Sequence, residues 1–191
     1  AWPPKGGYVR FDYEPAEGLP AVHVSVHYNL YDGIPLMSKW ITARNSGTAP
    51  VTLDAFTSEI LAAVEHGSFV ETRNRAFPTP NIHVETDYAF SGMTARNTSR
   101  FSVHWRPDPD YETQVNYLRQ TPCLLEVGPE LGPAQRLEPG ETFTSFRAYL
   151  LVHDSTARER MGLAQRRMYR TIAPWTTENP LMMHVRHARE D

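Results

Sequence analysis

A group of aromatic, acidic and amide side chains between residues 105 and 117 has a composition that suits contact with a sugar. Sugar rings have apolar faces that pack on aromatic rings, and polar rims that hydrogen-bond to carboxylates and carboxamides. Pro107 and Pro109 interrupt the segment, so we predict a loop. Packing within this loop, or a contact between domains or subunits, is the alternative explanation. The candidate carbohydrate contacts are Trp105, Asp108, Asp110, Tyr111, Asn116 and Tyr117.

The histidines and the cysteine do not form a recognisable metal motif. His23 and His27 are expected to share one face of a strand. Four residues along a strand span about 13 Å, which is too far for both rings to bind one ion. Cys123 is the only cysteine, so an internal disulfide and a cysteine zinc site are excluded. We therefore predict no metal site, and Cys123 is interpreted as a small buried hydrophobic residue.

The 22 acidic residues give little support for a catalytic pair of carboxylates. A glycosidase needs two carboxylates about 5–10 Å apart on either side of the scissile bond. Asp32 is better explained by a turn, and Glu59 by an ion pair with a nearby arginine. Nucleophile-elbow, Walker and dinucleotide-binding motifs are also absent from the sequence. The sequence thus predicts neither a catalytic residue nor a cofactor in this chain.

The elements that would position these residues are mainly strands. Residues 22–30 alternate apolar and polar side chains, which is the period of a half-buried strand, and residues 36–44 read as the returning strand of a hairpin. Asp32 and Gly33 supply the turn between them. Residues 56–64 fit either a helix or a buried strand, and we favour a strand. Further strands are predicted at residues 7–13, 51–53, 82–86, 101–105, 124–127 and 142–152.

A helix is predicted over residues 156–172, where Ala157, Met161, Ala164, Met168 and Ile172 recur at helical spacing. Thr156 and Glu159 fit a capping box at its start, and a proline at position 174 ends it. After the helix, residues 181–185 are apolar on both sides, as in a strand of a parallel sheet. We therefore divide the chain into a β-supersandwich domain at 1–153, a linker helix and connection at 154–180, and the start of a truncated barrel domain at 181–191. The predicted fold class is mainly β, an antiparallel β-supersandwich with a C-terminal linker helix.

Several short motifs resemble those of a known family. Residues 28–36 (YNLYDGIPL), Lys39-Trp40, 45–47 (NSG) and 59–61 (EIL) are similar to the N-terminal β-supersandwich of alpha-galactosidase-like glycoside hydrolases, a domain that resembles galactose mutarotase in fold. Residues 167–170 (RMYR) and 173–180 (APWTTENP) resemble the linker that leads to the catalytic (β/α)₈ barrel of such enzymes. Their catalytic carboxylates lie on barrel strands, so the resemblance implies no catalytic residue here.

The resemblance implies a non-catalytic domain that supports a catalytic barrel of the same chain, with carbohydrate as the ligand of the full-length protein. A free-standing carbohydrate-binding module and a mutarotase-type sugar epimerase are the alternatives, and assembly into a homo-oligomer is left open. The formal net charge of −3 gives no reason to expect a nucleic-acid partner or an anionic membrane surface. No apolar run approaches the roughly 18 residues that a membrane span needs, so no membrane partner is predicted.

Overall fold

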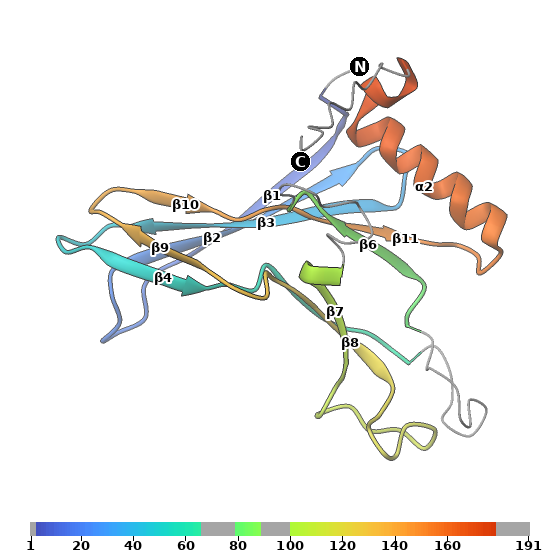
Figure 1. Ribbon diagram of the computed structural model, residues 1–191, viewed down its shortest axis with the longest axis horizontal. Coiled ribbons are helices and arrows are strands. Elements are labelled where there is room, and N and C mark those ends of the chain that lie inside the picture. Colours follow the sequence, from blue (N-terminus) through green and yellow to red (C-terminus); the bar gives the residue numbers. More distant parts are fainter. Residues whose placement is uncertain (1–2, 66–78, 89–99, 179–191) are drawn as a thin grey trace, which may run out of the picture.

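The computed structural model describes residues 3–65, 79–88 and 100–178, which form two β layers and a C-terminal helix (Figure 1). One layer is a six-stranded antiparallel sheet, here called the large sheet. The other layer contains a two-stranded and a three-stranded sheet, here called the small sheets. This architecture confirms the predicted antiparallel, mainly β fold.

The strands of the large sheet follow the spatial order β1 (Gly6–Tyr13), β2 (Val22–Tyr31), β3 (Leu36–Asn45), β11 (Ala148–Val152) and β6 (Ile82–Thr86), and the short β10 (Thr142–Thr144) also pairs with β3. The small sheets pair β4 (Val51–Ala55) with β9 (Pro133–Leu137), and β8 (Pro122–Val127) with both β5 (Glu59–Ala62) and β7 (Val103–Pro107).

The predicted hairpin of residues 22–45 forms the centre of the large sheet. Its register runs from Val22 opposite Asn45 to Leu30 opposite Met37 without a shift. Gly33 has a φ of 73° in the connecting turn, a conformation that costs an L-residue with a Cβ about 1–2 kcal/mol. The Asp-Gly turn and the alternation of the two strands therefore place the hairpin as the sequence predicts.

The large sheet buries one face against the small sheets. Val84 and Leu150 from the large sheet pack with Leu125 and Val127 from β8, and all four side chains are at most 7% exposed. A second cluster joins Ala43 and Phe143 of the large sheet to Leu137 of β9. Burial of these alternate positions is the main physical reason that the two layers pack together.

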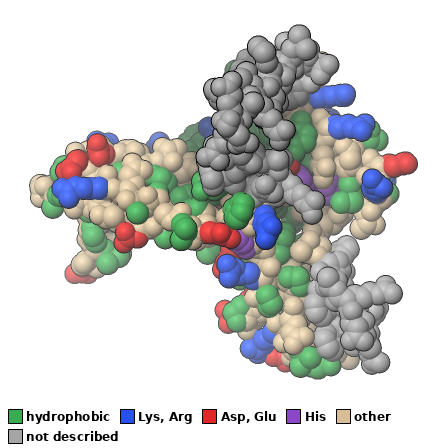
Figure 2. Space-filling model, viewed as in Figure 1, with side chains coloured by type: hydrophobic (Ala, Val, Ile, Leu, Met, Phe, Trp, Pro, Cys, Tyr) green, Lys and Arg blue, Asp and Glu red, His purple; other side chains and the backbone are tan. Residues whose placement is uncertain are grey.

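Helix α2 (Arg158–Ile172) covers part of the other face of the large sheet and is followed by the 3₁₀ helix η1 (Pro174–Glu178). Met168, which has no exposed surface, packs on Leu36 and Leu151, and Ala164 and Ile172 lie beside it. The predicted apolar stripe therefore docks on the sheet through Ala164, Met168 and Ile172, whereas its first member, Ala157, is exposed and precedes the helix. The opposite side is rich in arginine, and basic side chains gather over α2 in Figure 2.

Two sequence predictions are wrong in detail. Ala157 is the N-cap of α2 and makes no side-chain cap, so the capping box of Thr156 and Glu159 does not form. The Ser155 hydroxyl instead accepts the Ala157 N–H at 3.1 Å. The predicted strand 142–152 is broken between β10 and β11. There the Ser145 hydroxyl accepts the Ile41 N–H at 2.9 Å and donates to the Phe146 carbonyl at 2.8 Å.

Other boundaries differ as well. The strand predicted at residues 101–105 lies at 103–107. Strand β9 was not predicted, because its first four residues are exposed and its sequence does not alternate strictly between apolar and polar side chains. The segment 56–64 does contain a strand, at 59–62. The apolar segment 181–185 lies outside the described residues. None of the helices in the described ranges is long and apolar enough to cross a membrane.

Candidate functional site

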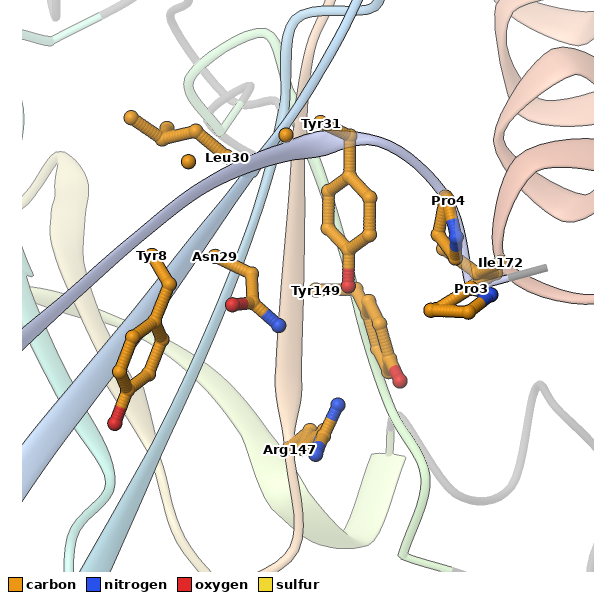
Figure 3. A pocket seen from close by; sticks show the side chains of 11 residues that line it. Pro3, Pro4, Tyr8, Asn29, Leu30, Tyr31, Arg147, Tyr149 and Ile172 are labelled. Atoms are coloured by element: carbon orange, nitrogen blue, oxygen red, sulfur yellow. The ribbon is translucent and has the colours of Figure 1, made fainter. Parts of the chain in front are cut away.

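A pocket of about 250 Å³ lies on the outer face of the large sheet, beside the end of α2 (Figure 3). Its polar side chains come from three strands and one loop, and they point to the same side of the sheet in Figure 3. Its apolar wall comes from Ile172 of α2 and from the N-terminal prolines. We call it the Tyr149 pocket, and its lining side chains include Pro3, Pro4, Tyr8, Asn29, Tyr31, Arg147, Tyr149 and Ile172.

Strand register explains why these residues meet. Tyr8 lies opposite Asn29, Asn29 opposite Ser38, Ser38 opposite Tyr149, and Tyr149 opposite Glu85. Directly opposite residues project from the same face of an antiparallel sheet. One row of hydrogen-bonding side chains thus crosses β1, β2, β3, β11 and β6, and its two ends are 77 residues apart in sequence (85 minus 8).

A stack of flat side chains lies next to this row. The His27 and Trp40 rings are parallel within 4°, with centroids 4.8 Å apart. The Arg147 guanidinium lies 4.2 Å from the Trp40 ring centroid, and the Tyr8 ring stacks 6.1 Å from the same ring. A cation over an indole face is an attractive arrangement, so this contact fixes the guanidinium at the rim of the pocket.

His27 holds the stack in place through both ring nitrogens. Its Nδ1 hydrogen-bonds to the Tyr8 hydroxyl at 2.7 Å, and its Nε2 to the Thr42 hydroxyl at 3.0 Å. Burial and the positive charges of Arg10 and Arg147 lower the pKa of His27. The ring is therefore neutral at pH 7, with one nitrogen donating and the other accepting.

Electrostatics keep the phenol of Tyr149 protonated. Burial and the nearby Asp87 carboxylate raise the pKa of Tyr149 to about 12, so its O–H remains a donor. Burial alone would raise the pKa of Glu85. The Tyr169 hydroxyl, which donates to the carboxylate, and His83, whose Nε2 lies 3.1 Å away, outweigh burial and lower it. Glu85 is thus an ionised anchor for α2.

The pocket offers phenol, carboxamide and guanidinium groups beside aromatic rings. These groups can donate and accept hydrogen bonds with a polyol while a ring packs on its apolar face. No carboxylate is among the side chains that line it, so it lacks the acid pair of a glycosidase. In the described part of the chain, no three His, Cys, Asp or Glu side chains are grouped to hold a metal ion.

The predicted carbohydrate contacts of residues 105–117 lie elsewhere, on β7 and the loop that follows it. Trp105 is partly buried and packs against the core between the layers. An Asp108 carboxylate oxygen accepts the Asp110 N–H at 2.9 Å, which closes a local turn. The exposed members are Asp110 and Tyr117, whose side chain is 50% exposed.

Two members of this set stabilise the loop itself. The Asn116 carboxamide is buried, and its oxygen accepts the N–H groups of Gln120 and Thr121 at 3.1 and 3.2 Å. A hydrogen bond to Glu65 raises the pKa of Tyr111 to about 12. The structure therefore places the set on β7 and the loop after it but turns Asn116 and Tyr111 toward partners within the protein. A sugar contact at the exposed positions stays a prediction.

The Tyr149 pocket was not predicted from the sequence. Its one local signal is the polar face of the hairpin, where His27, Asn29 and Trp40 occupy alternate positions. Tyr8, Arg147 and Tyr149 reach this face only through strand pairing over long sequence distances.

Comparison with known proteins gives no identification, since neither a family model, nor a curated protein, nor a solved structure matches this chain.

Proposed function

We propose that this chain is the non-catalytic β-sandwich domain of a carbohydrate-active glycoside hydrolase and that it contacts carbohydrate through the Tyr149 pocket. The resemblance of residues 28–36, 45–47 and 173–180 to alpha-galactosidase-like enzymes supports the class of protein. The antiparallel two-layer architecture with a C-terminal helix agrees with that resemblance.

The composition of the pocket is the observation that carries the carbohydrate proposal. Tyr8, a residue that is 55% exposed, presents an aromatic ring beside the side chains of Asn29 and Tyr149. The Arg147 guanidinium lies over the Trp40 ring and adds several N–H donors in a rigid planar group. An aromatic surface bordered by hydrogen-bond donors and acceptors suits one sugar ring, and a volume of about 250 Å³ can hold a group of about that size.

A non-catalytic role follows from the positions of the carboxylates. Glu85, the acidic member of the row of residues that crosses the large sheet, accepts a hydrogen bond from Tyr169 of α2. Asp87 accepts the backbone N–H of Arg147 at 2.6 Å. Both acids therefore have structural partners. We place the hydrolytic carboxylates on the catalytic barrel that the resemblance implies.

We place the contact with that barrel on the α2 side of the domain. Leu163 is 62% exposed and Val152 is 51% exposed, and both line a groove with Ile34 and Pro35. An apolar groove bordered by arginines is a suitable surface for an adjoining domain.

Titration with methyl galactosides, glucosides and mannosides, followed by calorimetry or NMR shifts, tests the carbohydrate proposal. Tyr149→Phe removes one hydroxyl and keeps the ring, so we expect it to weaken binding roughly two- to tenfold, the range for one hydrogen bond. Tyr117→Ala, in the 105–117 loop, is the control and should leave the affinity unchanged. The reverse pattern would move the site to that loop, and the absence of any sugar binding would contradict the pocket proposal.

A further inference from the structure

Strand β1 has an outer edge to which no described residue is paired, because β1 is the last strand in the order of the large sheet. All eight of its residues are exposed. Val9, Phe11 and Tyr13 project from one face and are 45%, 52% and 56% exposed. Long edge strands with apolar side chains are surfaces that pair with another strand.

The backbone of β1 fixes which residues can form that pairing. Asp32 donates its N–H to the Lys5 carbonyl at 3.0 Å, and the β1–β2 register continues to Tyr13 without a shift. Hydrogen-bonded residues alternate in an antiparallel ladder, so the odd-numbered residues of β1 bond to β2. The N–H and C=O groups of Tyr8, Arg10 and Asp12 therefore point to the open edge.

We propose that β1 pairs antiparallel with β1 of a second copy of this chain, about a two-fold axis at Phe11. In this register Arg10 lies opposite Asp12 of the second copy, and Asp12 opposite its Arg10. These are even-numbered residues, so they exchange the hydrogen bonds that the open edge requires. Phe11 lies opposite Phe11 of the second copy in a non-hydrogen-bonded pair, where side chains approach most closely.

The charges of Arg10 and Asp12 favour this register over the registers shifted by one or two residues. A shift of two residues one way places Arg10 opposite Arg10 of the second copy, and a shift the other way places Asp12 opposite Asp12. A shift of one residue places residues that bond to β2 opposite residues that point to the open edge, so the hydrogen bonds cannot form. It also puts the apolar side chains of one copy on the same face as the polar side chains of the other. Within the chain, Arg10 already lies 3.0 Å from Asp12, so the dimer would join two such pairs into a cluster of alternating charge.

A strand from an unrelated protein is a less suitable occupant, since the edge is complementary to itself. The charges at positions 10 and 12 are opposite in sign and lie on either side of Phe11. A two-fold axis at Phe11 therefore matches both charges at once. The apolar face of each β1, with Val9 and Tyr13, also continues across the axis, where Val9 meets Tyr13 of the second copy.

Sedimentation of the full 191-residue chain over a wide concentration range tests the proposal. We expect a reversible dimer. Arg10→Asp or Asp12→Arg places like charges opposite each other and should raise the dissociation constant about tenfold or more. Mixing these two single variants restores opposite charges at both positions and should restore association, as should the double variant. Circular dichroism checks that each variant is folded.

A cysteine scan tests the position of the axis. Phe11→Cys should form a covalent dimer on mild oxidation, because residues opposite in a non-hydrogen-bonded pair have Cα atoms about 4.5 Å apart, within disulfide range. Val9→Cys is the matched control, since two copies of that residue would lie about 13 Å apart along the strands. A monomer at every concentration, a dimer insensitive to both charge reversals, or cross-linking at Val9 in place of Phe11 would each overturn the proposal.

Discussion

Lys39 and Glu59 form an ion pair between the two layers. The Lys39 Nζ lies 2.7 Å from Glu59 Oε1, and the side chains are only 13% and 6% exposed. The sequence predicts that Glu59 pairs with an arginine. The ion pair is present, but the predicted partner is wrong, because Glu59 pairs with Lys39. Lys39 also lies 5.3 Å from the centre of the Tyr28 ring. Both contacts compensate for the loss of water around a buried ammonium group.

Gly33 supports a prediction about the role of a single residue. Its φ of 73° disfavours a Cβ, so Gly33→Ala should lower the free energy of unfolding by about 1 kcal/mol or more. Gly162→Ala is the matched control. Gly162 lies inside α2 with open space where an added Cβ would point, and alanine stabilises a helix by about 0.5–1 kcal/mol relative to glycine. Urea unfolding measures both. Equal effects of the two substitutions would contradict the role of the turn.

Among the elements, α2 shows how a helix is held by a sheet. Its apolar stripe docks on Leu36 and Leu151, and Tyr169 donates a hydrogen bond to Glu85 of β6. An isolated helix of 15 residues is marginal in water, so this docking is the main source of its stability. The lack of a side-chain cap at Ala157 strengthens that conclusion.

Met168→Ala should therefore destabilise the domain by about 2–5 kcal/mol, the usual cost of a cavity left by a buried methionine. Leu163→Ala on the same helix is the control, since Leu163 is 62% exposed and Met168 has no exposed surface. Thermal unfolding followed by circular dichroism compares the two. Similar shifts in Tm for both variants would show that α2 does not depend on its contact with the sheet.

For the whole molecule, the position of the acids leads to a prediction about activity. The Tyr149 pocket has no carboxylate in its lining, and the nearest acids have structural partners. The purified chain should therefore show no hydrolysis of aryl α-galactosides or other aryl glycosides above the uncatalysed rate. Turnover that survives purification and is lost in Glu85→Gln or Asp87→Asn would place the active site in this domain.

The sequence by itself determined the local elements. Alternation in residues 22–30 and 36–44, the Asp-Gly turn and the spacing of Met161, Ala164 and Met168 predicted the hairpin and the helix. These signals are local, because the period of apolar side chains depends only on backbone geometry and on which face is buried. The same reasoning failed at Ser145, where it predicted a continuous strand. There the Ser145 side chain accepts a backbone N–H of β3, and the spacing of apolar residues gives no sign of such a contact.

Only the tertiary structure decided the sheet order, the ion pair of Lys39 with Glu59 and the Tyr149 pocket. Tyr8, Asn29 and Tyr149 become neighbours because β1, β2, β3 and β11 pair in one register. Strand pairing links residues far apart in the chain, and many pairings satisfy the same alternation. The burial of the opposite face against the small sheets selects one of them, and that selection places the polar row on the outer surface.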